Sequence, residues 1–495
     1  MNLSKSKYCA GIQCSKILWM DRNMPEQFDQ STVDETRIAT GHAVGELARG
    51  YFGDYAEVPF DRMNIGGMIS ETRRLIDARN DVIAEASFLY DGNFCSVDIL
   101  RKTGNGYEIV EVKSSTKFDD FYYDDMAYQY YVVTNSGLPV SKVSLMHLSS
   151  AYTRQGELDM QKLFTISDCL GPALFTRQEC IGELIAEFKE VAAQETEPEI
   201  NIGSHCMDCG YKAWCLRGLP QPSVFDIGFG IRSLKKDLAY EIGIISFKEI
   251  FNSDFPLNEM QLLQVKTAVL NLPPHIEPYS IRQFLNGLTY PLHHLDFETC
   301  QQAIPLWDGV KPYQQIPFQY SLHRQHKPGA EPFHKEFLGK EGTDPRRALA
   351  ERLCGDIPLG ACVLAYSAVF EKGRIRELAE LYPDLSEHLM NIHGNIKDLA
   401  EPFRKGYYYC REMGGSYSIK AVLPALFPNE PELNYSALNL IHNGGEAMTA
   451  FATLHEKTAE EIAEIRAALL AYCRLDTLAM VRILDKLHEI VEREL

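Results

Sequence analysis

The segment Phe94–Ser115 constrains the fold of this chain more than any other part of the sequence. Two stretches within it, Cys95–Leu100 and Tyr107–Lys113, alternate between apolar and polar residues, as strands with one buried face do. Between them lies Gly104-Asn105-Gly106, whose residues tolerate the positive φ angles of a tight turn. This pattern predicts a β-hairpin.

The predicted hairpin brings charged residues together. Side chains two residues apart on a strand point to the same face, so Glu111 and Lys113 should lie side by side. Asp98 is on the partner strand, within reach of the same place. Two carboxylates bind a hard divalent cation, and a lysine orients a water or neutralises a developing phosphate charge. The alternative is a Glu-x-Lys pair on the solvent face of an edge strand, with no catalytic role.

Asp98, the run Glu111-Val112-Lys113 and then Gln129, on a helix predicted over Asp119–Thr134, resemble the RecB-like branch of the PD-(D/E)xK nucleases. The resemblance implies that Asp98 and Glu111 bind the metal and that Lys113 and Gln129 complete the site. On an earlier predicted helix, Glu46 follows a glycine that stands where the family usually has histidine. Glu46 is therefore expected to complete the metal shell.

A second group of residues suited to an inorganic centre consists of cysteines. A C-x2-C-x5-C run can direct three sulfurs to one place, and an N-terminal cysteine is the expected fourth donor. The four residues are Cys206, Cys209, Cys215 and Cys14. This layout resembles the iron–sulfur nucleases of CRISPR adaptation and of the AddAB repair complex, in which a [4Fe–4S] cluster ties the two ends of the nuclease domain together. A zinc site with four cysteine ligands and buried inert thiols are the alternatives, with Cys9 or His205 as substitute ligands.

The C-terminal part carries a different set of acids. Asp296 and Glu298 are two residues apart on a short apolar strand, so both can face one pair of cations. This motif resembles the first motif of RNase H-like 3′→5′ exonucleases of the DnaQ type. Glu371 follows the strand predicted over Ala361–Tyr366 and stands where that family's second motif usually has aspartate.

The third motif of that family is expected on the last helix. Thr458 and Glu461 form the pattern of a capping box, and Tyr472 and Asp476 are four residues apart, hence on one helix face. The Tyr-x-x-x-Asp spacing resembles the DEDDy subgroup. The resemblance implies that Asp296, Glu298, Glu371 and Asp476 hold two cations about 4 Å apart and that Tyr472 positions the attacking water.

These motifs predict an α/β (α+β) chain of three parts. Residues 1–220 are expected to form a PD-(D/E)xK restriction-endonuclease-like domain with the iron–sulfur cluster, and residues 290–495 an RNase H-like exonuclease domain. Residues 221–289 are a helical connector, in which Gly243 marks either a helix-hairpin-helix turn or a packing spacer. The arrangement resembles a poorly characterised bacterial family in which a RecB-like nuclease carries a C-terminal domain of unknown function.

Composition limits the mode of action. A net charge of −19 argues against a protein that coats nucleic acid non-specifically, so contacts are expected at local basic patches such as Arg73-Arg74 or Lys235-Lys236. The odd number of cysteines, 13, indicates reduced thiols in a cytoplasm. No run of eighteen apolar residues and no N-terminal apolar signal core is present, so membrane insertion and secretion are not expected.

The sequence therefore predicts a cytoplasmic protein with two nuclease sites, each using Mg²⁺ or Mn²⁺, with DNA favoured over RNA as the substrate. Since there is no Walker A pattern, unwinding would require a partner helicase, or a repair or defence complex. Two alternatives stay open. In one, only the C-terminal site is active and the first domain is a DNA-binding platform; in the other, the chain is a non-catalytic scaffold that binds DNA ends.

Overall fold

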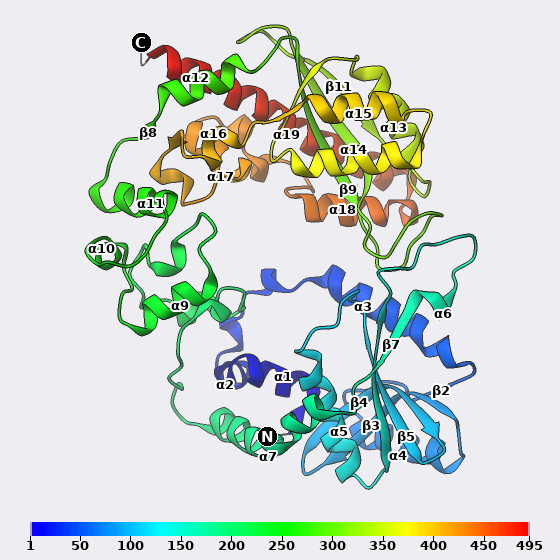
Figure 1. The fold of residues 1–495 in the computed structure, drawn as a ribbon. Helices are drawn as coiled ribbons and strands as arrows, with labels where there is room; N and C mark the ends of the chain where they lie inside the picture. Colours follow the sequence, from blue (N-terminus) through cyan, green and yellow to red (C-terminus); the bar gives the residue numbers. More distant parts are fainter. Residues whose placement is uncertain (1, 494–495) are drawn as a thin grey trace. The chain divides into compact units, whose positions relative to one another are not determined.

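The computed structural model describes residues 2–493, which fold into two compact units of mixed α/β structure (Figure 1). The first unit contains the chain up to Gly218 together with Gln302–Gln314. The second contains Leu219–Gln301 and the chain from Gln315 onward. The change of unit at Gly218 lies close to the expected boundary at residue 220. The sequence pattern does not predict the return of Gln302–Gln314 to the first unit.

The first unit is built on a seven-stranded mixed sheet. In sheet order its main strands are β2 (Ala56–Glu57), β3 (Val82–Tyr90), β4 (Asn93–Thr103), β5 (Gly106–Lys113), β6 (Val140–Leu148) and β7 (Phe164–Asp168). The short strand β1 (Leu3–Ser4) pairs in parallel with the beginning of β4. Strand β4 is thus bordered by different strands along its length, with β1 at its start and β5 at its end.

Strands β4 and β5 form the predicted hairpin. The two strands pair from Thr103↔Gly106 to Ile99↔Val110 and diverge beyond that point. Gly106 has φ +142°, and a Cβ atom there would lie 2.4 Å from the carbonyl oxygen of Pro139, so only glycine fits. The prediction of a hairpin with a glycine-dependent turn is confirmed.

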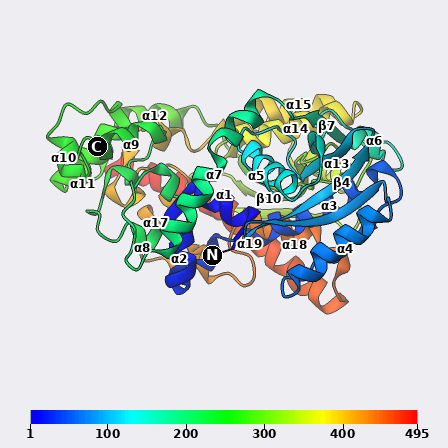
Figure 2. The ribbon, with the colours of Figure 1, turned by 90° about the horizontal axis from the view of Figure 1, so that it is seen from below.

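Helices cover both faces of this sheet. They are α1 (Lys5–Gln13), α2 (Ser15–Asn23), α3 (Glu35–Arg49), α4 (Ile65–Asp77), α5 (Tyr122–Asn135), α6 (Met160–Leu163), α7 (Pro172–Ala193) and α8 (Lys212–Cys215). Helices α1, α5 and α7 pack together on one side (Figure 2), where the rings of Tyr8 and Tyr128 stack with centroids 4.9 Å apart. Helix α3 packs on the other side through the buried residues Val44 and Ala48.

The N-terminal segment is firmly attached to this sheet. The side chain of Leu3 is fully buried, its amide donates to the carbonyl oxygen of Gly92 at 3.0 Å, and its carbonyl accepts a hydrogen bond from the Tyr128 hydroxyl at 2.7 Å. Complete burial of a leucine side chain contributes about 2 kcal/mol. Since α1 begins directly after β1, this attachment fixes the position of Lys5, the first residue of the helix.

The second unit contains a five-stranded sheet in the order β11 (Phe333–Leu338), β10 (Ile316–Gln325), β9 (Leu292–Cys300), β12 (Cys362–Ala365) and β13 (Ile396–Asp398). The first three strands are antiparallel to one another, and β9, β12 and β13 are parallel. One face of the sheet packs against the 35-residue helix α19 (Ala459–Arg493). The other face packs, through residues such as Leu295, on α13 (Arg346–Asp356), α14 (Val369–Leu381) and α15 (Ser386–Asn395).

The remaining elements of the second unit lie outside this sheet. The region of the predicted connector forms α9 (Ser233–Glu241), α10 (Phe247–Phe251), α11 (Glu259–Leu270), β8 (His275–Ile276) and α12 (Pro278–Asn286). Farther along the chain are α16 (Glu401–Arg404), β14 (Tyr408–Tyr409), α17 (Ile419–Leu426) and α18 (Gly444–Ala452). Gly243, with φ +78°, lies in the turn between α9 and α10, where the sequence predicts a tight turn.

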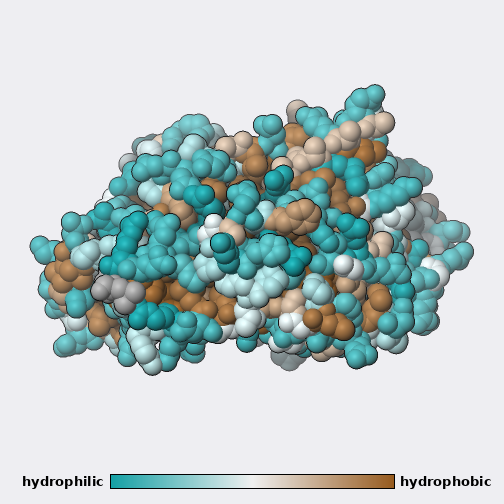
Figure 3. Space-filling view, turned by 90° about the horizontal axis from the view of Figure 1, so that it is seen from above, coloured by the Kyte–Doolittle hydropathy of each residue, from teal (hydrophilic) through white to brown (hydrophobic). Residues whose placement is uncertain are grey.

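The face drawn in Figure 3 is mostly hydrophilic, and its hydrophobic residues form separate patches. None of the helices within residues 2–493 combines the length and the apolar character that crossing a membrane requires.

Candidate functional site

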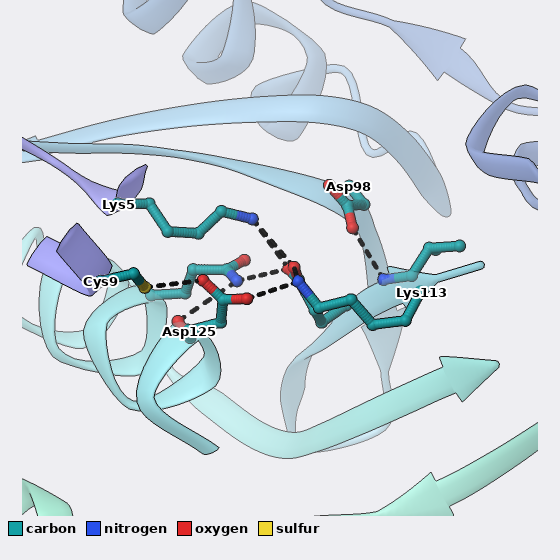
Figure 4. Close-up of polar contacts among 8 residues, drawn as sticks. Lys5, Cys9, Asp98, Lys113 and Asp125 are labelled. Atoms are coloured by element: carbon teal, nitrogen blue, oxygen red, sulfur yellow. Dashed lines mark hydrogen bonds and ion pairs between the residues drawn. The ribbon is translucent and has the colours of Figure 1, made fainter. Parts of the chain in front are cut away.

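The first unit contains a buried polar group of side chains around Glu111, which we call the Glu111 cluster (Figure 4). Its members are Lys5, Cys9, Asp98, Glu111, Lys113, Asp125 and Gln129. Lys5 Nζ donates to both Glu111 oxygens, at 3.0 and 3.1 Å. Lys113 Nζ donates to Oε1 at 2.8 Å, and Gln129 Nε2 donates to Oε2 at 2.5 Å. A carboxylate has about four lone-pair positions, so these four contacts saturate Glu111.

Asp98 lies where β4 and β5 diverge. Its Oδ2 accepts a hydrogen bond from the Val112 amide at 2.7 Å, which satisfies an N–H group that the hairpin ladder no longer pairs. Burial and the nearby charge of Glu111 raise the pKa of Asp98 to about 7. Glu85 lies across from it on β3, at a residue with φ +56° that interrupts the pairing, and forms an ion pair with Arg49 at 2.9 Å.

Two further members of the cluster come from the helices and were missed by sequence reasoning. Asp125 on α5 forms an ion pair with Lys113, and its other oxygen accepts a hydrogen bond from the Cys9 thiol at 2.9 Å. Asp125 is four residues before Gln129, and Cys9 is four after Lys5, so each pair lies on one helix face. The i,i+4 spacing to Gln129 is a signal that could have identified Asp125.

The cluster holds Glu111 in its ionised form. Burial alone would raise the pKa of this carboxyl, but Lys113 and Lys5 lower it well below its usual value. Burial would likewise lower the pKa of both lysines, and the charge of Glu111 raises it instead. Glu111 is therefore a charged group at neutral pH, surrounded by donors that it keeps protonated.

The structure places Glu46 apart from this cluster. Its side chain is exposed on α3, whose buried face carries Val44 and Ala48. Within the described part of the chain, no hydrogen bond or ion pair joins Glu46 to Asp98 or Glu111. The carboxylate that lies near Asp98 in addition to Glu111 is that of Glu85.

The second unit brings together four acids that we call the acidic cluster, namely Asp296, Glu298, Glu371 and Asp476. Asp296 and Glu298 lie on β9, and one ligand atom from each falls within 4.8 Å of the other and of the Cys473 sulfur on α19. Asp476 follows Cys473 by three residues on α19. Glu371 is buried on α14, and its charge contributes to the raised pKa of Asp296 after burial, Asp476 and Glu298.

Tyrosines surround Asp476. The Tyr435 hydroxyl donates a hydrogen bond to Asp476 Oδ1 at 2.6 Å, and the rings of Tyr435 and Tyr472 lie 5.9 Å apart. Burial, followed by the charges of Asp476 and Glu298, raises the pKa of Tyr472 well above its usual value. Tyr472 therefore faces the carboxylates, as its predicted role requires. Tyr435, Cys473 and Lys420 were missed by sequence reasoning. No spacing links Tyr435 or Lys420 to the motifs, whereas Cys473 lies within the Tyr-x-x-x-Asp motif and could have been identified from it.

The positive charges that oppose the acidic cluster act from a distance: Lys420 acts on Glu298 and Asp476, and Arg374 acts on Glu371. No ion pair within 4.0 Å involves any of its four members among residues 2–493. Glu371 Oε2 and Asp476 Oδ2 are buried without a hydrogen-bond partner. Burial raises the pKa of Glu298 and Glu371 to about 8 and that of Asp476 to about 7. Buried, mutually repelling carboxylates of this kind are stabilised by a bound cation.

A cavity of about 280 Å³ lies beside these acids. Asp296 and Asp476 line it together with Lys420 and Ser367. The cavity thus offers carboxylates for a cation and an exposed ammonium group for an anion such as a phosphate.

The raised pKa values predict a pH-dependent stability. The usual values of these acids lie near 4, so between about pH 4 and 8 the folded state binds more protons than the unfolded state. In EDTA, the free energy of unfolding should therefore fall by at least about 2 kcal/mol from pH 5.5 to 8.5. Urea unfolding at several pH values measures this. The double variant Glu298→Gln, Glu371→Gln should show a shallower fall, and an equal slope in both proteins would contradict the prediction.

The four predicted cysteines converge on one cavity in the first unit, and we call them the cysteine centre. Cys14 interrupts the helices α1 and α2 with an extended backbone (φ −166°, ψ 116°), and Cys215 ends α8. Cys206 and Cys209 lie in the turn before α8, and all four residues line the same cavity. No disulfide bond joins the cysteines within residues 2–493.

The surroundings of the cysteine centre suit an inorganic group. Trp19, Met20 and Tyr211 form a hydrophobic cluster beside it. Burial raises the pKa of Cys215; the charge of Lys16 lowers it, while the neighbouring Cys209, Cys206 and Cys14 raise it further. The four thiols are thus close enough to repel one another as thiolates, which a metal would offset.

The two substitute ligands differ in position. Cys9 donates to Asp125 in the Glu111 cluster and does not line the cavity of the cysteine centre. His205 does line it, with Nε2 3.4 Å from the Cys206 sulfur. Cys14 is therefore the N-terminal cysteine that meets the C-terminal run.

Comparison with known proteins identifies one related segment. Residues 293–418 match a family model described as a domain of unknown function, DUF2779. The match includes Asp296, Glu298 and Glu371 and ends before Tyr472 and Asp476. Neither a curated protein nor a solved structure matches the chain.

Proposed function

We propose that this protein is a metal-dependent nuclease that hydrolyses phosphodiester bonds, with DNA favoured over RNA as its substrate. The second unit would act as a 3′→5′ exonuclease of the RNase H-like, DEDDy type. The first unit would be a RecB-like PD-(D/E)xK domain with a second site. A role in DNA repair, mobile-element processing or anti-phage defence, alongside a helicase or a repair complex, is compatible with this activity.

The acidic cluster carries the proposal. Its acids come from three separate stretches of the chain, β9, α14 and α19, yet they meet in one buried place where none of them forms an ion pair within 4.0 Å among the described residues. Such an arrangement is costly to fold unless it binds cations. Two of its buried oxygens have no hydrogen-bond partner, which leaves lone pairs free for a metal.

Each residue of the acidic cluster and its surroundings would have a distinct role in hydrolysis. Bound Mg²⁺ or Mn²⁺ would activate a water and stabilise the charge that develops on the phosphate. Asp296, Glu298, Glu371 and Asp476 would hold the cations, and Tyr472 would orient the attacking water. Lys420, at the cavity, would bind a phosphate of the substrate strand. Tyr435 would keep Asp476 in place through its hydrogen bond.

The Glu111 cluster supports a second, similar site. Asp98 and Glu111 would be its metal ligands, and Lys113 would face the phosphate. Gln129 and Asp125 would position them, since Gln129 holds Glu111 and Asp125 holds Lys113. Glu111 is ionised at neutral pH, as a metal ligand must be.

The cysteine centre is proposed to bind a [4Fe–4S] cluster. Four thiols from the two ends of the first unit line its cavity, which fits a group that ties these ends together. A tetrahedral zinc site with four cysteine ligands is the alternative occupant of this centre.

End-labelled single- and double-stranded DNA and RNA, incubated with Mn²⁺, test the function. Wild type, Lys113→Ala, Asp296→Ala and the double variant should be compared. We expect each single variant to lose a different product, by at least about 100-fold in rate, and the double variant to lose both. If Asp296→Ala alone reduces cleavage, the first unit is a binding platform. If wild type cleaves none of these substrates, the proposed function is wrong.

A further inference from the structure

We propose that Lys5 is a built-in competitor of the divalent cation at the first site: its ammonium group occupies the position at Glu111 that a metal would take. This inference rests on the proposed function of the Glu111 cluster and deepens it. It predicts that the Lys5 side chain blocks the metal position at Glu111 until a cation displaces it.

The position of the Lys5 ammonium supports this assignment. It contacts both oxygens of Glu111 at nearly equal distances, 3.0 and 3.1 Å, as a cation held by a bidentate carboxylate does. In Figure 4 the Lys5 side chain extends into the cluster, and the charge of Asp98 acts on its ammonium group together with that of Glu111. A metal bound by Asp98 and Glu111 would need the same space.

The charge of the cluster leads to the same conclusion. Three carboxylates, those of Asp98, Glu111 and Asp125, face two ammonium groups, those of Lys5 and Lys113. With both lysines in place, the negative charge that remains is too small to retain a divalent cation well. Without Lys5, the same carboxylates carry enough charge to balance one.

Lys5 is the lysine that can leave. Lys113 is held by Asp125 as well as by Glu111, whereas the described hydrogen bonds of the Lys5 ammonium go to Glu111 alone. The Lys5 side chain is 22% exposed and has four rotatable bonds, so it can turn toward solvent while α1 stays in place. Displacement of Lys5 therefore needs no movement of the sheet or of α5.

Metal binding without catalysis tests the inference. A background with Asp296→Asn and Asp476→Asn confines Mn²⁺ binding to the first site, and electron paramagnetic resonance of free Mn²⁺ gives the affinity. In this background Lys5→Met should tighten Mn²⁺ binding at least about tenfold. The control Lys7→Met removes the same charge from the same helix, outside the cluster, and should leave the affinity unchanged.

Two further variants separate the outcomes. Lys5→Gln keeps a hydrogen-bond donor for Glu111 and removes only the charge, so it should also tighten binding if Lys5→Met fails to fold. Glu111→Gln combined with Lys5→Met should abolish binding. Equal or weaker affinity in both Lys5 variants, with binding still dependent on Glu111, would overturn the role of Lys5 and leave the proposed site standing. Absence of Glu111-dependent binding in every variant would overturn both.

Discussion

Replacement of Asp476 with asparagine should reduce 3′→5′ hydrolysis at the second site at least about 10³-fold. An asparagine can keep the local structure, because its carbonyl oxygen still accepts the hydrogen bond from Tyr435. Its amide nitrogen, however, would occupy the place of Oδ2, the buried oxygen without a hydrogen-bond partner. The substitution thus removes one metal ligand and one negative charge while the fold persists.

A matched control lies on the same helix. Asp485 on α19 accepts hydrogen bonds from Gln325 and from the Gly329 amide, outside the acidic cluster. Asp485→Asn should leave hydrolysis unchanged within about twofold. Rates on a 3′-end-labelled single strand and Mn²⁺ affinity measure both variants. Full activity and unchanged Mn²⁺ affinity in Asp476→Asn would show that Asp476 is no ligand.

Replacement of Cys209 with serine should remove the inorganic group and destabilise the first unit. The group would join Cys14, between α1 and α2, to the run that ends at Cys215, so its loss would release two distant segments from each other. Protein purified without oxygen should be brown with broad visible absorbance, and the variant should be colourless. Its Tm should fall by at least about 5 °C.

Cys180 provides the control for this experiment. It is an exposed cysteine on α7, and Cys180→Ser should retain both the colour and the Tm. Colourless wild-type protein that contains stoichiometric zinc would contradict the iron–sulfur assignment. An unchanged Tm in Cys209→Ser would contradict the structural role of the centre.

Local patterns predicted the parts of the fold on which the sites depend. The hairpin follows from two alternating stretches and a glycine turn, and α19 begins where Thr458 and Glu461 form the expected reciprocal capping contacts. Residues whose roles depend on short spacing, such as Asp296 with Glu298, were predicted together and lie together. Hydrophobic periodicity and helix capping depend on residues that are close together in the chain, so both can be recognised in the sequence alone.

Residues brought in by tertiary packing were not predictable in this way. Lys5 reaches Glu111 only because β1 pairs with the start of β4, where β5 has diverged. Tyr435 reaches Asp476 from a segment with no regular period. Glu46 was assigned from a family motif that is incomplete in this chain, and its side chain is exposed on α3.

Helix α1 joins two centres that are otherwise far apart in the chain. Lys5 at its first turn and Cys9 one turn later belong to the Glu111 cluster, and Cys14 caps its last turn. A nine-residue helix is a rigid rod of about 13 Å. An interaction that fixes Cys14 at the end of α1 therefore also restricts the position of Lys5 at its beginning. In the proposed function, binding of the inorganic group at the cysteine centre would therefore change how readily the first site accepts a cation.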